Sequence, residues 1–257
     1  MLESRDDAYS SAFSSTALSD KSRSLKARAT SDPWDFTWIH NYTALGDSYA
    51  AGIGAGNASS GSGDAVCSRY DGAFPVILNS YLNNLQAFQF IACTGDTSND
   101  VVTKQISTLA DSSLDLVTVS AGGNDVGFRS VLEACVYLTT TQQACTDAIN
   151  DAGGPTKIAQ LRSSVDSVIS TLAPKMKAGH VVIWALYAEF WNSVPNYCDN
   201  QTWAYWDPLG IAGLKLTSDN RNEMNKLVNY VNGNISSVIA SSTGSNRPSQ
   251  LNIVTAM

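Results

Sequence analysis

The 257-residue sequence contains no apolar run long enough to cross a membrane, and its start, residues 1–7, is charged. A transmembrane helix needs about 20 consecutive apolar residues, so none is expected. The charged start also excludes a secretory signal peptide within this sequence. Basic residues are few, because 16 Lys and Arg stand against 23 Asp and Glu, for a formal net charge of −7. We therefore expect no nucleic-acid partner.

Histidine is nearly absent, with His40 and His180 alone, and closely paired cysteines are missing. No two of the five cysteines are spaced as CxxC, which argues against a zinc or thioredoxin-like site. An odd number of cysteines leaves one thiol without a partner in this sequence. The cysteines are Cys67, Cys93, Cys135, Cys145 and Cys198.

Four Asn-x-Ser/Thr sequons are candidate glycosylation sites, at Asn41, Asn57, Asn200 and Asn234. Together with the cysteines and the low lysine content, they favour an extracellular protein. On this interpretation the signal peptide is missing from the sequence.

The composition, 44% hydrophobic and 15% charged, is sufficient for one α/β domain with a full core. Residues 1–33 are rich in Ser, Ala and charge, and we expect a disordered tail or propeptide remnant. Residues 34–257 alternate between short β-branched runs and amphipathic patterns, which predicts helices over 156–176 and 218–241. Strands separated by helices indicate a doubly wound parallel sheet of about five strands with helices on both faces. The expected strands are 42–45, 88–92, 116–120, 181–186 and 251–255.

Three motifs follow these strands at their C-terminal ends, where the active sites of parallel sheets lie. They are Gly46-Asp47-Ser48, Gly95 and Asn124. A serine hydroxyl can act as a nucleophile, and glycine backbone and asparagine side-chain N–H groups can stabilise the oxyanion of acyl transfer. Each residue also has a structural interpretation: Ser48 as a helix cap, Gly95 as a turn residue and Asn124 as a loop residue. Asp47 is expected to hold its turn through an Asx-type bond, and the joint pattern favours a serine ester hydrolase.

These motifs, within 46–52, 92–95 and 122–128, resemble in order the blocks of the SGNH (GDSL-type) hydrolases, in the branch of secreted actinomycete and fungal esterases and lipases. The resemblance covers residues 42–257 and implies a three-layer, flavodoxin-like α/β fold. It implies Ser48 as nucleophile and backbone oxyanion donor, Gly95 as a second backbone donor and Asn124 as a side-chain donor. The substrate would be an acylglycerol, a short-chain acyl ester or an acetylated carbohydrate, hydrolysed by a monomer without metal or cofactor.

The cysteines also resemble the framework of that family. The resemblance implies disulfides between Cys67 and Cys93 and between Cys135 and Cys145. Cys198 would then stay unpaired, its partner being absent from this sequence.

The sequence departs from the family in its last block, where the catalytic histidine should follow the fifth strand. His40 and His180 instead precede strands, which places them at the wrong edge of the sheet. We therefore assign no general base and expect this C-terminally truncated chain to be nearly inactive, because a serine hydroxyl is a weak nucleophile without one. The alternatives are a non-catalytic, ligand-binding member of the fold, or a hydrolase that recruits His180 or His40.

An aromatic segment extends over 190–206, from Phe190 and Trp191 to Trp203 and Trp206. It could line an acyl or sugar pocket. It could equally be a hydrophobic lid packed on the domain.

Overall fold

The computed structural model describes residues 35–61, 63–138, 140–192, 194–195, 198–203, 213–242 and 252–256. The predicted tail, residues 1–33, lies outside this description. The chain divides into two compact units, residues 1–38 and 39–257. In the described end of the first, the Asp35 carboxylate accepts hydrogen bonds from the backbone and hydroxyl of Thr37. All further description concerns the second unit.

The second unit is built on a parallel sheet with the strand order β2-β1-β3-β4-β5. This is the flavodoxin-like order of a doubly wound sheet, and it confirms the predicted fold class. The strands are β1 (Asn41–Gly46), β2 (Ala87–Phe90), β3 (Leu114–Ser120), β4 (Met176–Ala185) and β5 (Asn252–Ala256).

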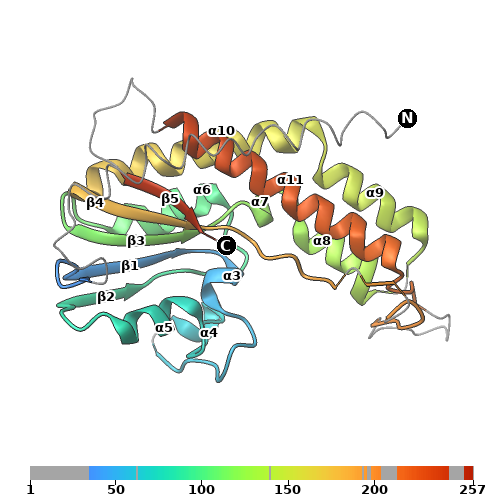
Figure 1. Ribbon diagram of the computed structural model, residues 1–257, viewed down its shortest axis with the longest axis horizontal. Coiled ribbons are helices and arrows are strands. Elements are labelled where there is room, and N and C mark those ends of the chain that lie inside the picture. Colours follow the sequence, from blue (N-terminus) through green and yellow to red (C-terminus); the bar gives the residue numbers. More distant parts are fainter. Residues whose placement is uncertain are drawn as a thin grey trace. The chain divides into compact units, whose positions relative to one another are not determined.

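Helices cover both faces of the sheet. Figure 1 shows α10 and α11 side by side above the strands and α4 and α5 below them. The helices that precede β3 are α3 (Ser48–Ala51), α4 (Asp64–Cys67), α5 (Phe74–Tyr81) and α6 (Ser98–Asp100), which continues as the π-helix Val101–Gln105 and the 3-10 helix Ile106–Thr108. Those that follow are α7 (Gly123–Val126), α8 (Phe128–Leu132) with the π-helix Glu133–Tyr137, α9 (Gln142–Ala152), α10 (Pro155–Leu172) with the 3-10 helix Ala173–Lys175, and α11 (Ser218–Ser242).

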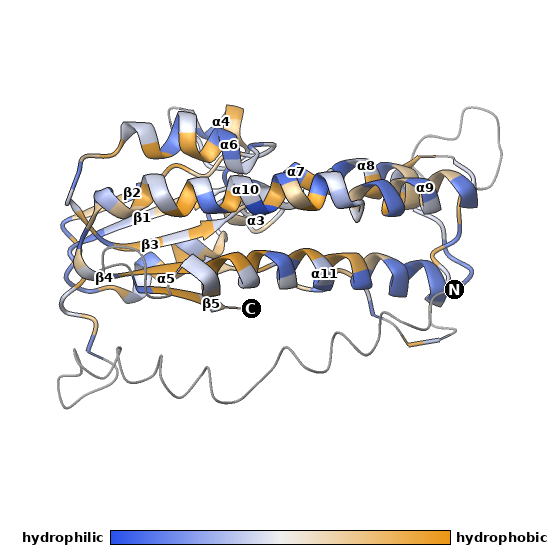
Figure 2. Ribbon diagram, turned by 90° about the horizontal axis from the view of Figure 1, so that it is seen from above, coloured by the Kyte–Doolittle hydropathy of each residue, from blue (hydrophilic) through white to orange (hydrophobic). Residues whose placement is uncertain are grey.

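Helices α10 and α11 bury the apolar stripes predicted for them. Leu161 and Val165 of α10 and Val231 and Ile235 of α11 are fully buried. Apolar and polar residues alternate along both helices, as Figure 2 shows, so each buries one face and exposes the other. No helix in the described ranges is long and apolar enough to span a membrane.

The boundary between α10 and β4 differs from the prediction. The helix ends at Leu172 rather than 176, and β4 begins at Met176 rather than 181. Pro174 lies in a 3-10 turn between them, because proline cannot continue the hydrogen bonding of an α-helix. Met176 pairs with Leu114 across an irregularity in the β3–β4 register. Because residues 177–180 are not β-branched, the sequence pattern does not predict this early part of β4.

Other strand boundaries differ by one or two residues, and β3 begins at Leu114 rather than 116. β2 ends at Phe90, two residues before the predicted end, because Ile91 and Ala92 both donate their N–H groups to the single carbonyl of Ala44. β5 ends at Ala256, and Leu251 lies outside the described residues.

Candidate active site

The C-terminal ends of β1, β2 and β3 meet at one edge of the sheet. Gly46 of β1 pairs with Ser120 of β3, and the next residue, Asp47, donates its N–H to the Ser120 carbonyl at 2.9 Å. Cys93, just beyond β2, donates its N–H to the Gly46 carbonyl at 2.9 Å. The three sequence motifs therefore leave the sheet side by side.

Gly46 and Asp47 shape the turn that carries Ser48. Gly46 has a φ of +134°, and a Cβ there would lie 2.2 Å from the Ser120 carbonyl oxygen, so only glycine fits. Asp47 caps α3, because its Oδ1 accepts the N–H of Tyr49 at 2.9 Å. This is the predicted Asx-type bond, and it means that Ser48 is not the cap. Within the described ranges, neither the hydroxyl nor the backbone N–H of Ser48 has a hydrogen-bond partner.

Gly95 lies exposed in the turn after β2, with a φ of +87° and no atom within 4 Å of a Cβ placed there. Its neighbours Thr94 and Asp96 donate their N–H groups to the carbonyls of Cys67 and Cys93, at 3.0 and 3.2 Å. No described group accepts the N–H of Gly95. The turn therefore leaves one backbone donor open at this position.

Asn124 belongs to α7, directly after β3. Its side-chain Nδ2 donates to the carbonyl of Asp96 at 2.8 Å. This bond ties the third motif to the residue after Gly95. An amide group carries two N–H donors, so the second remains available.

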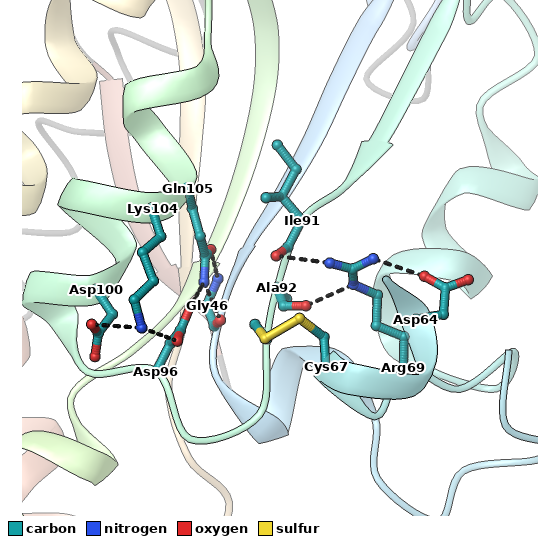
Figure 3. The surroundings of a disulfide bond; sticks show 11 residues. Gly46, Asp64, Cys67, Arg69, Ile91, Ala92, Asp96, Asp100, Lys104 and Gln105 are labelled. Atoms are coloured by element: carbon teal, nitrogen blue, oxygen red, sulfur yellow. Dashed lines mark hydrogen bonds and ion pairs between the residues drawn. A yellow bond between two sulfur atoms is a disulfide. The ribbon is translucent and has the colours of Figure 1, made fainter. Parts of the chain in front are cut away.

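The side chain of Gln105 holds the turns of Gly46 and Asp96 in place. Its amide accepts the N–H of Gly46 and donates to the Gly46 carbonyl, both at 2.9 Å. It also donates to Asp96 Oδ2 at 2.7 Å. Lys104 adds an ion pair to each of Asp96 and Asp100, at 3.4 and 2.9 Å, as drawn in Figure 3.

A disulfide between Cys67, the last residue of α4, and Cys93 ties that helix to the turn after β2. Beside it, the Arg69 guanidinium donates to the carbonyls of Ile91 and Ala92, at 3.3 and 2.8 Å, and pairs with Asp64 at 2.7 Å (Figure 3). The second disulfide joins Cys135 to Cys145. Both are the pairs that the family resemblance implies.

Two carboxyl groups lie beneath the motifs. Burial raises the pKa of Asp47 to about 6, although its hydrogen bond from the Tyr187 hydroxyl lowers it. Burial also raises the pKa of Asp125, whose Oδ2 accepts the N–H and hydroxyl of Ser98 at 2.9 and 3.0 Å. Both groups are engaged with the scaffold, and the charge of Asp125 contributes to the raised pKa of Asp47.

Sequence reasoning missed Tyr187 and Gln105. Tyr187 follows the apolar end of β4, and Gln105 lies in the largely polar stretch 103–108, so periodicity assigns neither of them a role. A signal for Tyr187 existed in α11, where Asn225 and Asn232 interrupt the buried stripe seven residues apart. Buried side-chain amides need hydrogen-bond partners. Two of them on one face of α11 therefore indicate that another segment of the chain lies along that face and bonds to both.

The two histidines lie at the opposite edge of the sheet. His40 precedes β1, and the six-residue strand at about 3.3 Å per residue puts it roughly 20 Å from the turn of Ser48. His180 lies within β4 rather than before it. Its neighbour Val181 is level with Leu116 and hence with Tyr42, near the start of β1, and its Nδ1 lies 3.0 Å from Asp115 Oδ1.

The remaining predicted residues are not part of this edge. Cys198 is a free, half-buried thiol. Among the sequons, Asn57 and Asn200 are exposed, Asn41 lies in β1 with its amide donating to the Ser113 carbonyl at 3.0 Å, and Asn234 lies in α11. Among the residues described, no cluster of three or more His, Cys, Asp or Glu could hold a metal ion.

The aromatic segment lies partly against the domain. Phe190 contacts Phe128 edge-on at 6.4 Å, and Trp191 contacts Trp203 at 5.5 Å. Phe128 follows α7 by two residues, so the segment approaches the Asn124 motif. Residues 204–206 of the predicted segment lie outside the described residues. A small apolar hollow here is lined by Phe128, Val131, Leu132, Phe190, Trp191, Met224, Leu227 and Val228.

Comparison with known proteins agrees with this geometry. A sequence model of the GDSL-like lipase/acylhydrolase family matches residues 44–232. Lipase 1 of Streptomyces coelicolor is 30% identical over 220 residues, which cover 86% of this chain and 73% of the relative. Phospholipase A1 from Streptomyces albidoflavus NA297 is 33% identical with a TM-score of 0.63, over 79% of this chain and 76% of its own. The extracellular lipase from Streptomyces rimosus is 25% identical with a TM-score of 0.64, over 84% and 80%.

The family match spans the segment that carries the three motifs, from β1 to α11. The relative from Streptomyces coelicolor matches most of this chain, and both solved structures share the fold of this chain. The chain therefore belongs to the GDSL-like lipase/acylhydrolase family and is a carboxylic ester hydrolase of that family.

Proposed function

We propose that ester hydrolysis proceeds through an acyl-Ser48 intermediate. The Ser48 hydroxyl attacks the ester carbonyl, the alcohol leaves with a proton, and water then releases the acid. The backbone N–H groups of Ser48 and Gly95 and the Asn124 side chain would bind the oxyanion. The observation that carries this proposal is that the N–H groups of Ser48 and Gly95 are both unpaired in the described structure, at neighbouring strand ends.

The acyl part of an apolar ester is the substrate group that fits best. The hollow beside Phe128 and Phe190 is too small to enclose an acyl chain, but its apolar lining gives an ester an apolar surface to lie on and offers little to a sugar. The relatives are named lipases and a phospholipase A1, which supports the same choice. We further propose an extracellular location, because two disulfides persist where the environment is oxidising.

The proton of the Ser48 hydroxyl needs an acceptor, and the placement of His40 and His180 leaves the chain without a histidine base at this edge. We infer that residues 1–257 alone hydrolyse esters slowly. Loss of a triad member leaves an acceleration of about 10³–10⁴ over water, from binding and the oxyanion hole.

Free imidazole can test this assignment, because it can replace an absent histidine as base. Hydrolysis of p-nitrophenyl butyrate by residues 1–257 is measured with and without imidazole, beside Ser48→Ala, Asn124→Ala and the control Ser80→Ala, which removes a hydroxyl exposed on α5. We expect an imidazole-dependent rate that Ser48→Ala abolishes. Asn124→Ala should lower it by about 10²-fold, as removal of an oxyanion donor does, and Ser80→Ala should leave it unchanged.

Equal rates for the wild type and Ser48→Ala at every imidazole concentration would overturn the proposal. If the ester then binds without turnover, the non-catalytic interpretation holds. Turnover that requires His180 or His40 would show that another base serves the site.

A further inference from the structure

One buried hydroxyl joins the nucleophile motif to the asparagine motif. Tyr187, two residues beyond β4, is 3% exposed. Its hydroxyl donates to Asp47 Oδ2 at 2.5 Å and accepts the N–H of Gly123 at 2.8 Å. Asp47 precedes Ser48, and Gly123 precedes Asn124. The hydroxyl therefore lies between the two motifs and bonds to the neighbour of each key residue.

Tyr187 is itself held in place from α11. The Asn232 side chain accepts the N–H of Tyr187 at 3.1 Å and donates to its carbonyl at 2.8 Å. The ring contacts those of Tyr49 and Phe128 edge-on, at 5.6 and 5.4 Å between centroids. The backbone of Tyr187 is thus fixed from α11, and its ring is fixed by one aromatic residue from each of the two motif segments.

The Tyr187 hydroxyl contributes hydrogen bonds that packing alone does not require. A buried hydroxyl costs free energy unless it is hydrogen-bonded, and a phenylalanine ring would fill the same volume. Gly123 leaves room for it, since a Cβ there would lie 3.2 Å from the tyrosine oxygen. Burial also raises the pKa of Tyr187 well above 10, so the group stays protonated and can donate.

We propose that Tyr187 is a positioning residue, which fixes the Ser48 backbone N–H and the Asn124 side chain relative to each other. The inference rests on the proposed function, in which these two groups share one oxyanion. Donors act strongly in a transition state only when they are held in place beforehand. Tyr187 does not touch the substrate, and it acts through Asp47 and Gly123.

The test compares Tyr187→Phe with Tyr42→Phe in the imidazole-dependent assay. Tyr42 is a matched control, because it is also fully buried and its hydroxyl bonds Thr118 at 2.9 Å inside the sheet. We expect Tyr187→Phe to lower kcat about tenfold with KM unchanged, since a small misplacement of reacting groups can cost up to about 10²-fold. Tyr42→Phe should leave kcat within about twofold of the wild-type value, even if its melting temperature falls as far as that of Tyr187→Phe.

A double variant separates positioning from general weakening of the fold. In the Asn124→Ala background one of the two groups is gone, so Tyr187→Phe should have a much smaller effect on kcat than it has in the wild type. If Tyr187→Phe does not fold, Asn232→Ala takes its place, with the same expected fall in kcat at unchanged KM.

Two outcomes would overturn the inference. One is a kcat for Tyr187→Phe that matches Tyr42→Phe while the reaction still depends on Ser48. The other is full additivity with Asn124→Ala. Equal rates for wild type and Ser48→Ala would instead overturn the proposed function, and this inference with it.

Discussion

At the scale of single residues, the site depends on groups that carry no chemistry themselves. Asp47 takes over the capping of α3, which leaves the hydroxyl of Ser48 unpaired. Gln105 bonds both backbone groups of Gly46 at the point where β1 leaves the sheet. Each of these side chains supplies a hydrogen bond to a backbone N–H group beside the turn, because such groups need partners when they are buried.

Asp47 should make stability depend on pH in a direction opposite to that of most carboxylates. Its pKa is about 6 in the folded protein against about 3.9 unfolded. The folded state therefore binds the proton more tightly, and the stability that Asp47 contributes is complete below about pH 4 and is lost as the pH rises through about 6. Asp47→Asn removes this dependence. The free energy of unfolding of the variant minus that of the wild type should therefore be larger at pH 8 than at pH 4, by about 2–3 kcal/mol.

Urea unfolding at pH 4 and pH 8 measures this difference. Comparison with the variant cancels the other carboxylates, such as Asp100, whose pKa of about 2 acts in the opposite direction. A wild-type-to-variant difference that is the same at both pH values would contradict the buried, weakly acidic state of Asp47.

At the scale of elements, α11 does more than cover the sheet. Asn232 holds Tyr187, and Asn225 forms the same pair of bonds with Trp191, at 3.2 and 2.7 Å. Arg221, 2% exposed, donates to the carbonyls of Asn192 and Val194. The segment after β4 therefore lies along α11, and side chains of the helix hold it by hydrogen bonds to its backbone.

The two disulfides should differ in their effect on stability and on the site. Cys67–Cys93 closes 26 residues and Cys135–Cys145 closes 10. From loop entropy, replacement of each pair by serine should cost about 3.5 and about 2.7 kcal/mol respectively. The Cys67 carbonyl also accepts the N–H of Thr94 beside Gly95, so loss of the first pair should lower the Ser48-dependent rate as well.

Urea unfolding and the imidazole-dependent assay measure the two effects. The Cys135→Ser/Cys145→Ser variant is the control, because its loop lies beyond α8. An equal loss of rate in both double variants would show that the first disulfide has no particular effect on Gly95.

At the scale of the whole molecule, periodicity was sufficient for the sheet and insufficient for the supports of the site. Strands β1 and β3 are short, mostly apolar runs, and α11 has an apolar stripe from Met224 to Ile239, more than four turns, so these elements can be recognised in the sequence. The start of β4 cannot, because Lys177 to His180 lack the β-branched residues of a strand. Tyr187 and Asn232 were missed because their importance depends on a contact between residues 45 positions apart.

The surface of the whole molecule predicts which sequons accept a glycan on secretion from a eukaryotic host. Asn57 and Asn200 are exposed in loops, whereas Asn41 lies in β1 between two other strands. We expect glycans at Asn57 and Asn200 and none at Asn41. Asn→Gln variants at each position, compared by mass with and without glycosidase, measure this. A mass loss on Asn41→Gln would mean that β1 forms only after modification.

Arg69 has a consequence for association between copies of the chain. In the described sheet β2 is an edge strand, and an unpaired edge is a template on which another chain can add and start aggregation. The guanidinium of Arg69 occupies the carbonyls of Ile91 and Ala92, just where β2 leaves the sheet. An incoming strand would have to displace a cation that is already paired with Asp64. The same contact that steadies the turn of Gly95 thus also limits how far an added strand could extend beyond β2 along this edge.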